Sequence, residues 1–250
     1  MIERDVTIGN ARLILGDSYQ VLPTLGWIEQ LCMDPPYVLR TAGGGQFRDQ
    51  RGHTDRIAEQ GMDKGFDHAI INPLLCGSVI VFCHNDQIPA LTTYLAGNFE
   101  RFVLCMWIKS NPMPVANKHY QPDSEIFIHA YNEGAEAVGG DGPDSQFYAH
   151  AWSDGHHPVG ALADKKRYVF SQVGRARDFN HPTVKPDAVM DKIMRNIGAA
   201  SVCDPFMGTG STGVAALKAG KSFIGIEKDP AHFETACRRI AAAAALKVAA

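Results

Sequence analysis

One stretch of the chain, residues 201–229, constrains the fold more than any other. A short apolar strand leads into Asp204, a glycine-rich turn and a helix through residues 214–218 follow, and residues 223–226 form a second apolar run that ends at Glu227. Two buried strands joined by a helix form a βαβ unit, which is typical of the parallel sheet of an α/β protein. The carboxylate that ends the second strand is placed to accept hydrogen bonds from the two hydroxyls of a ribose.

The turn of this unit carries the residues that bend the chain and start the helix. Gly208 and Gly210 tolerate the positive φ angles that a tight turn requires. Ser211 or Thr212 is placed to cap the helix, and Gly220 is placed where the helix ends. A turn this open lets the backbone approach a nucleotide-like ligand closely.

Three ligand classes fit such a unit. Residues 208–213 match the G-x-G-x-x-G pattern of dinucleotide sites, which is a weak signal by itself. A phosphate-binding loop fits poorly, because residues 220–222 follow the helix and Ala215 stands where that motif needs a glycine. The third class is S-adenosylmethionine, since residues 204–212 resemble the Asp-Pro-Phe-x-Gly-x-Gly-Thr/Ser-Thr cofactor loop of amino-group DNA methyltransferases.

A second motif, Asp34-Pro35-Pro36-Tyr37, interrupts the apolar strand at residues 31–33. The two prolines end the strand and hold Asp34 and Tyr37 at the carboxyl edge of the sheet, where open α/β folds bind ligands. The carboxylate of Asp34 and the carbonyl of Pro35 are suited to accept both hydrogens of an exocyclic amine, which favours a tetrahedral nitrogen able to attack a sulfonium methyl group. Tyr37 offers a flat face for an extruded base. A plain turn is the alternative, and it weakens once the glycine-rich loop is considered.

Taken in chain order, five segments resemble the β-class, permuted amino DNA methyltransferases. They are Gly16-Asp17, Asp34-Pro35-Pro36-Tyr37, Trp107-x-Lys109-x-Asn111-Pro112, His181-Pro182-Thr183-x-Lys185-Pro186 and the loop at 204–212. The tetrapeptide precedes the cofactor loop by about 170 residues, and this order distinguishes the β class from the α and γ classes.

The resemblance implies both a fold and a domain layout. It implies an α/β fold with a Rossmann-like seven-stranded mixed sheet, that of class I S-adenosylmethionine-dependent methyltransferases, with a circularly permuted motif order. We expect residues 1–250 to form a single domain, residues 38–68 to form a mobile loop, and residues 111–180 to hold a small inserted target-recognition region.

The resemblance also implies roles for individual residues. Asp17 would meet the cofactor adenine, Phe206 and the glycine loop would enclose the cofactor, Glu227 would hold the ribose, and Thr183 with Lys185 would close the pocket. The residues expected to bind the cofactor are Asp17, Thr183, Lys185, Asp204, Phe206, Gly208, Gly210, Ser211, Thr212 and Glu227.

The placement of charge predicts a path for DNA, although the net charge is −3. Residues 121–164 contain eight acids and no lysine or arginine, whereas residues 165–195 contain eight basic residues and three acids. Such a local excess can face a phosphate backbone, and solvated helix faces are an equal alternative. The expected DNA contacts are Lys109, Lys165, Lys166, Arg167, Arg175 and Arg177.

The sequence therefore predicts a site-specific DNA methyltransferase that transfers a methyl group from S-adenosylmethionine to N6 of a flipped adenine in double-stranded DNA. An N4-cytosine enzyme is the nearest alternative, since the same geometry serves both amines; the cytosine enzymes more often begin the tetrapeptide with serine. An RNA-modifying relative is a weaker alternative. A nicotinamide-dependent oxidoreductase leaves the tetrapeptide idle, and a catalytically silent DNA-binding module leaves both active-site motifs unexplained.

The remaining expectations concern partners and location. We expect a homodimer on a short site, and a cytoplasmic protein without a membrane span, because no apolar run approaches roughly 20 residues. No metal is expected, because His156-His157 has no cysteine or glutamate at ligand spacing. The six cysteines form no C-x-x-C pair and are expected to be reduced core residues.

Overall fold

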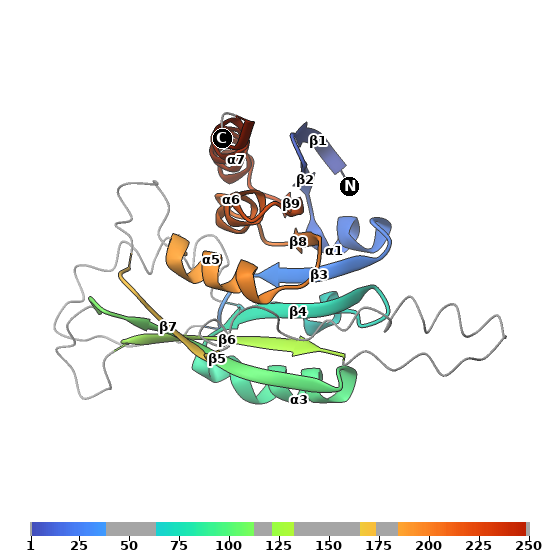
Figure 1. Cartoon of the computed structure of the whole chain (residues 1–250). Helices are drawn as coiled ribbons and strands as arrows, with labels where there is room; N and C mark the ends of the chain where they lie inside the picture. Colours follow the sequence, from blue (N-terminus) through green and yellow to red (C-terminus); the bar gives the residue numbers. More distant parts are fainter. Residues whose placement is uncertain (1, 39–63, 113–121, 133–165, 174–184, 249–250) are drawn as a thin grey trace, which may run out of the picture.

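A computed structural model describes residues 2–38, 64–112, 122–132, 166–173 and 185–248, which form a mixed sheet flanked by helices (Figure 1). Its strands are β1 (Ile2–Ile8), β2 (Ala11–Gly16), β3 (Ile28–Met33), β4 (Cys76–Cys83), β5 (Arg101–Lys109), β6 (Ser124–Tyr131), β7 (Tyr168–Ser171), β8 (Ser201–Asp204) and β9 (Ser222–Glu227). Its helices are α1 (Ser18–Val21), α3 (Ile88–Asn98), α5 (Asp187–Asn196), α6 (Ser211–Lys218) and α7 (Pro230–Val248), with short 3-10 turns η1 (Leu22–Thr24), η3 (His68–Ile70) and η4 (Asn85–Gln87).

The sheet confirms the predicted α/β class and corrects the predicted strand count. The described strands follow the order β1-β2-β9-β8-β3-β4-β6-β5-β7, which makes nine rather than seven. The two additional strands lie at the edges: β1 forms an antiparallel hairpin with β2, and β7 pairs in parallel with β5. An unpaired edge leaves a row of backbone donors and acceptors without partners, and β1 and β7 satisfy one such row each.

Alternation of side chains along the central strands gives the sheet two apolar faces. On β3, Cys32 belongs to one buried cluster, whereas Leu31 and Met33 belong to the other. On β4, Ile80 belongs to the first cluster and Val79 to the second. Because successive residues of a strand point to opposite faces, continuous apolar runs of this kind require cover on both sides. The first cluster also contains residues of α5, α6 and α7, and the second contains residues of α1 and α3.

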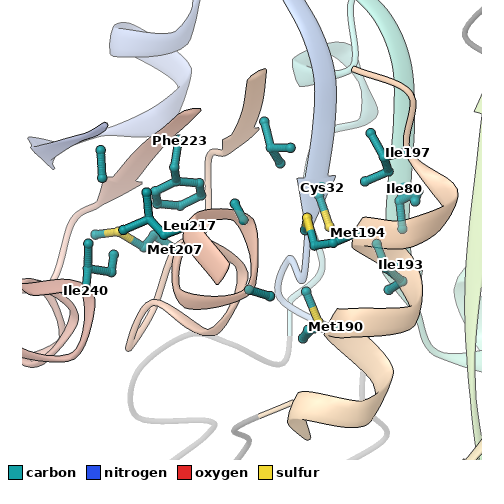
Figure 2. Packing of buried hydrophobic residues seen from close by; sticks show 14 of the residues in the cluster. Cys32, Ile80, Met190, Ile193, Met194, Ile197, Met207, Leu217, Phe223 and Ile240 are labelled. Atoms are coloured by element: carbon teal, nitrogen blue, oxygen red, sulfur yellow. The ribbon is translucent and has the colours of Figure 1, made fainter. Parts of the chain in front are cut away.

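Helix α5 shows how the first face is covered. Met190, Ile193 and Met194 lie on one stripe of the helix, and Ile197 follows directly after its last residue. All four belong to the same buried cluster as Cys32 and Ile80 of the sheet (Figure 2). All four are at most 3% exposed, so each contributes roughly 1.5–3 kcal/mol of hydrophobic burial. This packing fixes the position of α5. Lys185 lies two residues before the helix, so its position is fixed as well.

The strand directions bring several chain segments to one edge of the sheet. Strands β3, β8 and β9 are mutually parallel and end at Met33, Asp204 and Glu227, so the loops that follow them lie side by side. Strand β6 runs antiparallel to β4, and Ile126 pairs with Cys83, so the beginning of β6 lies at this same edge. Within the described residues, no helix is long and apolar enough to cross a membrane.

Candidate active site

The glycine-rich loop after β8 is organised by Asp204. Its Oδ1 accepts a hydrogen bond from the backbone N–H of Phe206 at 2.9 Å, and its Oδ2 accepts one from the Thr212 hydroxyl at 2.6 Å. Gly208 and Gly210 adopt φ angles of 54° and 85°, which side chains with a Cβ rarely tolerate. Burial raises the pKa of Asp204 from its ordinary value to about 7, although the Thr212 and Phe206 hydrogen bonds oppose this shift.

Helix α6 begins differently from the prediction. A side-chain cap from Ser211 or Thr212 is wrong, because Gly210 is the N-cap residue and no side chain makes a capping hydrogen bond there. The left-handed conformation of Gly210 starts the helix one residue earlier, which leaves the Thr212 hydroxyl inside the helix to hold Asp204. At the other end, Gly220 follows the helix with a φ of 81°, as a helix-terminating glycine does.

Glu227 lies beside this loop at the end of β9 and is 8% exposed. Its Oε2 accepts from the backbone N–H of Gly208 at 2.8 Å, and its Oε1 accepts from that of Asp229 at 2.8 Å. Because each carboxylate oxygen has a second lone pair, Glu227 can hold the loop and still accept hydrogen bonds from a ribose. This buried acceptor, set against an open glycine turn, fits the nucleoside part of S-adenosylmethionine.

Aromatic side chains line the neighbouring part of the edge. The ring of Phe206 lies 6.2 Å from that of Tyr19 and 6.2 Å from that of Phe66, both edge-on. The Tyr19 hydroxyl accepts from the backbone N–H of Asp67 at 2.9 Å, which ties α1 to the segment before η3. Asp17 caps α1 by accepting from the Tyr19 N–H at 2.9 Å. Flat apolar faces of this kind suit an adenine ring.

Helix α7 contacts the glycine-rich loop through Arg239. The Arg239 guanidinium donates to the Thr209 carbonyl at 2.7 Å and to the Thr209 hydroxyl at 3.0 Å. Its Nη1 also donates to the Ser211 hydroxyl at 3.4 Å. Burial lowers the pKa of Arg239 below its ordinary value, although the charge of Asp187 opposes this shift.

The tetrapeptide lies at the end of β3, next to β8 and its loop. Tyr37 donates its hydroxyl to Asp34 Oδ1 at 2.8 Å, and Lys185 donates its ammonium to Asp34 Oδ2 at 2.5 Å. Gln87 donates its amide to the Pro36 carbonyl at 3.3 Å, which anchors the middle of the motif to η4. Burial raises the pKa of Tyr37 well above its ordinary value, and the charges of Asp34 and Glu125 add to the effect. Tyr37 therefore stays a neutral hydrogen-bond donor.

Two carboxylates and two ammonium groups alternate along this edge, in the order Asp34, Lys185, Glu125 and Lys109. Lys185 Nζ lies 2.5 Å from Asp34 Oδ2 and 3.3 Å from Glu125 Oε2, and Lys109 Nζ lies 3.0 Å from Glu125 Oε1. Burial by itself would lower the pKa of Lys185, but Asp34 and Glu125 outweigh it and raise that pKa. Burial would likewise raise the pKa of Glu125, but Lys185 and Lys109 outweigh it and lower that pKa. Lys185 and Glu125 are consequently both charged at neutral pH.

The structure thus brings the two predicted motifs to one edge of the sheet, and it places other predicted residues elsewhere. Lys185, predicted to close the cofactor pocket, contacts Asp34 and Tyr37 of the tetrapeptide. Lys166 and Arg167 are exposed just before β7, and Lys109 is paired with Glu125. Several predictions lie outside the described residues: those on Thr183, Lys165, Arg175, Arg177, His156-His157 and most of the segments 38–68 and 111–180.

Sequence reasoning missed Glu125, Gln87 and Arg239. Glu125 carries a usable signal, because it is a charged residue immediately before the mostly apolar run 126–130. Reading that signal requires the direction of β6, which only the assembled sheet shows. Gln87 and Arg239 act on backbone carbonyls of distant segments, and nothing in the sequence marks that kind of contact.

Comparison with known proteins agrees with this geometry. A family model described as DNA methylase (N6_N4_Mtase) matches residues 32–238. Type II methyltransferase M2.LlaDCHI of Lactococcus lactis subsp. cremoris is 24% identical over an aligned length of 258 residues. The match covers 92% of this chain and 89% of that protein. DNA adenine methyltransferase YhdJ of Escherichia coli (strain K12) is 41% identical over 64 residues, 24% of this chain and 21% of that protein.

Solved structures share the fold. The crystal structure of the M1.HpyAVI–SAM complex superposes with a TM-score of 0.60 at 23% identity, covering 92% of this chain and 99% of that one. Because the family model spans most of its length, the chain belongs to the N6/N4 DNA methylase family. It is therefore an S-adenosylmethionine-dependent DNA methyltransferase, and DNA is its substrate.

Proposed function

We propose that this methyltransferase modifies N6 of an adenine flipped out of double-stranded DNA. The support is Asp34, a carboxylate that begins the tetrapeptide, where the cytosine enzymes that the motif resembles more often carry serine. A local match to a protein named as an adenine methyltransferase points the same way. An N4-cytosine target is the alternative, because the family model is named for both amines.

The tetrapeptide would act as a set of hydrogen-bond acceptors. Asp34 and the Pro35 carbonyl would accept the two hydrogens of the target amine, which localises the nitrogen lone pair for attack. Tyr37 would stack on the base, which contributes roughly 1–3 kcal/mol toward the few kcal/mol that flipping costs. In the structure, the Tyr37 hydroxyl and the Lys185 ammonium already contact the two Asp34 oxygens, so the amine must share or displace one of them.

A second group of residues would hold the cofactor. Glu227 would accept the ribose hydroxyls, Phe206 and Tyr19 would face the adenine, and the glycine turn would approach the remainder of the molecule. Asp17, Asp204, Ser211, Thr212, Thr183 and Lys185 complete the proposed set. When bound, S-adenosylmethionine supplies an electrophilic methyl group on a sulfonium.

The observation that carries the proposal is that Asp34 follows strand β3 and Glu227 ends strand β9, the two strands that flank β8 in the sheet. The test is to incubate the protein with DNA and labelled S-adenosylmethionine, digest the DNA to nucleosides and separate them. We expect N6-methyladenosine in its deoxy form. Label in N4-methylcytosine alone would overturn the adenine assignment and leave the family assignment standing.

Asp34→Ala tests the mechanism separately from binding. Loss of one of two acceptors on the amine should lower the single-turnover rate by about 10²-fold to 10³-fold, by analogy with deletion of one oxyanion-hole donor. Tyr37→Phe keeps the stacking face and should retain much of the activity, whereas Tyr37→Ala should weaken capture of the base. A folded Asp34→Ala variant that methylates at the wild-type rate would contradict this mechanism.

We also propose a homodimer that works in the cytoplasm, where DNA is accessible. The support is a group of exposed apolar side chains on one face of the last two strands of the sheet: Phe102, Leu104 and Met106 on β5 with Tyr168 and Phe170 on β7. A patch of this kind suits a protein interface. Sedimentation with and without DNA checks it, and a strictly monomeric mass in both conditions would count against the dimer.

A further inference from the structure

Glu125 is a charged residue of this edge to which the mechanism above gives no role. It begins β6 after Ser124, and its carboxylate lies between two lysines: Oε2 is 3.3 Å from Lys185 Nζ and Oε1 is 3.0 Å from Lys109 Nζ. Lys185 in turn contacts Asp34, so Glu125 reaches the tetrapeptide through one intervening side chain.

The surroundings of Lys185 make its position depend on both carboxylates. Its side chain is 7% exposed, and its ammonium lies 4.8 Å from the centre of the Phe82 ring and 5.6 Å from that of Tyr37. Among the described residues, the polar groups that contact it are Asp34 and Tyr37 after β3 and Glu125 on β6. Water screens such an enclosed cation poorly, so the two carboxylates determine where it lies.

We propose that Glu125 is a positioning residue for methyl transfer: it anchors Lys185, and Lys185 fixes the orientation of the Asp34 carboxylate toward the target amine. This inference rests on the proposed function, because only that function has Asp34 act on an amine. Lys109 completes the arrangement by holding the other oxygen of Glu125.

Two effects should follow when Glu125 loses its charge. Lys185 then has one carboxylate partner, so Asp34 is held less well and the rate of the chemical step falls while cofactor and DNA binding persist. The pKa of Lys185 should also fall, because burial lowers it and Asp34 and Glu125 together raise it. Since the charged form of Lys185 orients Asp34, the decline of rate at high pH should begin at a lower pH than in the wild type.

The experiment compares Glu125→Gln, Glu125→Asp and Asp123→Asn in the full-length protein. Asp123 is an exposed carboxylate two residues from Glu125, so its variant matches the change in charge near the same edge. Single-turnover methyl transfer is measured from pH 6.5 to 9.5, alongside calorimetric affinity for S-adenosylmethionine, DNA affinity and thermal unfolding.

For Glu125→Gln we expect a rate about tenfold to a hundredfold below wild type, the scale of a lost contact to a charged group. Both affinities should fall much less than the rate, because Glu125 contacts Lys185 and Lys109 and neither ligand. The alkaline decline of Glu125→Gln should move to lower pH. Glu125→Asp keeps the charge on a shorter side chain, so its rate should lie between that of Glu125→Gln and that of wild type, with the wild-type pH profile. Asp123→Asn should match wild type throughout.

A folded Glu125→Gln variant with the wild-type rate and pH profile would overturn the proposal. Should that variant fail to fold, Glu125→Asp decides: its shorter side chain lengthens the contact to Lys185, so a measurable fall in rate is expected, and a rate equal to wild type overturns the inference. Failure of the proposed function looks different, because then the wild type itself would not methylate DNA or Asp34→Ala would leave its rate unchanged.

Discussion

Glu227 shows how one side chain serves the loop and the predicted ligand together. Its two oxygens accept the backbone N–H groups of Gly208 and Asp229, which leaves one lone pair on each for a ribose. The position of the acid at the end of a strand is readable in the sequence, but its contacts to the loop are not, because they join residues 19 positions apart.

We predict that Glu227→Ala weakens binding of S-adenosylmethionine by more than tenfold. The ribose loses a charge-assisted acceptor that contributes roughly 1.5–3 kcal/mol, and Gly208 loses the partner that holds it. Glu227→Gln keeps one carbonyl acceptor and should lose less. Calorimetric titration measures both, and an unchanged affinity for the alanine variant would remove Glu227 from the cofactor site.

Asp204 gives a prediction about pH. Burial raises its pKa from 3.8 to about 7, so the folded protein keeps a proton that the unfolded chain releases between these values. Its contribution to stability is therefore full below about pH 4 and is lost as the pH rises through 7, at about 1.4 kcal/mol per pKa unit.

The variant Asp204→Asn cannot ionise, and its free energy of unfolding should depend less on pH between 5 and 8 than that of the wild type. Urea unfolding at several pH values measures the slope. Asp187→Asn, a change at an exposed carboxylate that pairs with Lys218, should keep the wild-type slope. If Asp204→Asn also kept it, the buried acid would not be the source of the pH dependence.

At the scale of elements, helices α7 and α5 position parts of the site: α7 contacts the glycine-rich loop, and α5 begins two residues after Lys185. Arg239 of α7 donates to the carbonyl and hydroxyl of Thr209, between the two glycines of the loop. We predict that Arg239→Met lowers affinity for S-adenosylmethionine roughly tenfold, because a hydrogen bond from a charged group is lost where the loop must be held. Arg238→Met, on the exposed side of the same helix, should leave the affinity unchanged.

Near-ultraviolet circular dichroism and thermal unfolding should show that Arg239→Met keeps its fold. An affinity as high as that of Arg238→Met would show that the loop holds its shape without α7. The sequence predicts an alanine-rich helix after residue 238 but not this role, because the contact depends on how α7 packs against α6 and the neighbouring strands.

The same limit applies to β6. Residues 125–130 predict a strand correctly, since apolar residues run through it, and β6 extends from Ser124 to Tyr131. Whether Glu125 lies at the active edge or at the opposite one depends on strand direction, which local pattern does not encode. The antiparallel pairing with β4 decides it. The pairing of Glu125 with Lys185 and Lys109 therefore cannot be predicted from the sequence and follows only from the folded structure.

For the whole molecule, motif order predicts the family and the fold class, and both are confirmed. Order identifies them because the two motifs are specific and because each follows a strand that ends at the same edge. The strand count is less predictable, since β1 and β7 are edge strands that pair with whatever backbone is open beside them. The DNA path is the largest prediction that stays untested.

That path gives the last prediction. Lys166 and Arg167 are exposed before β7, at the opposite edge of the sheet from the β1–β2 hairpin. If they contact DNA phosphates, Lys166→Gln combined with Arg167→Gln should weaken binding and flatten the dependence of log K on log salt by about 0.9 for each lost contact. Arg4→Gln with Arg12→Gln removes equal charge from the hairpin and should leave the slope unchanged. Fluorescence anisotropy with a labelled duplex at several salt concentrations measures both, and equal slopes would mean that the basic segment is a solvated surface rather than the place where DNA lies.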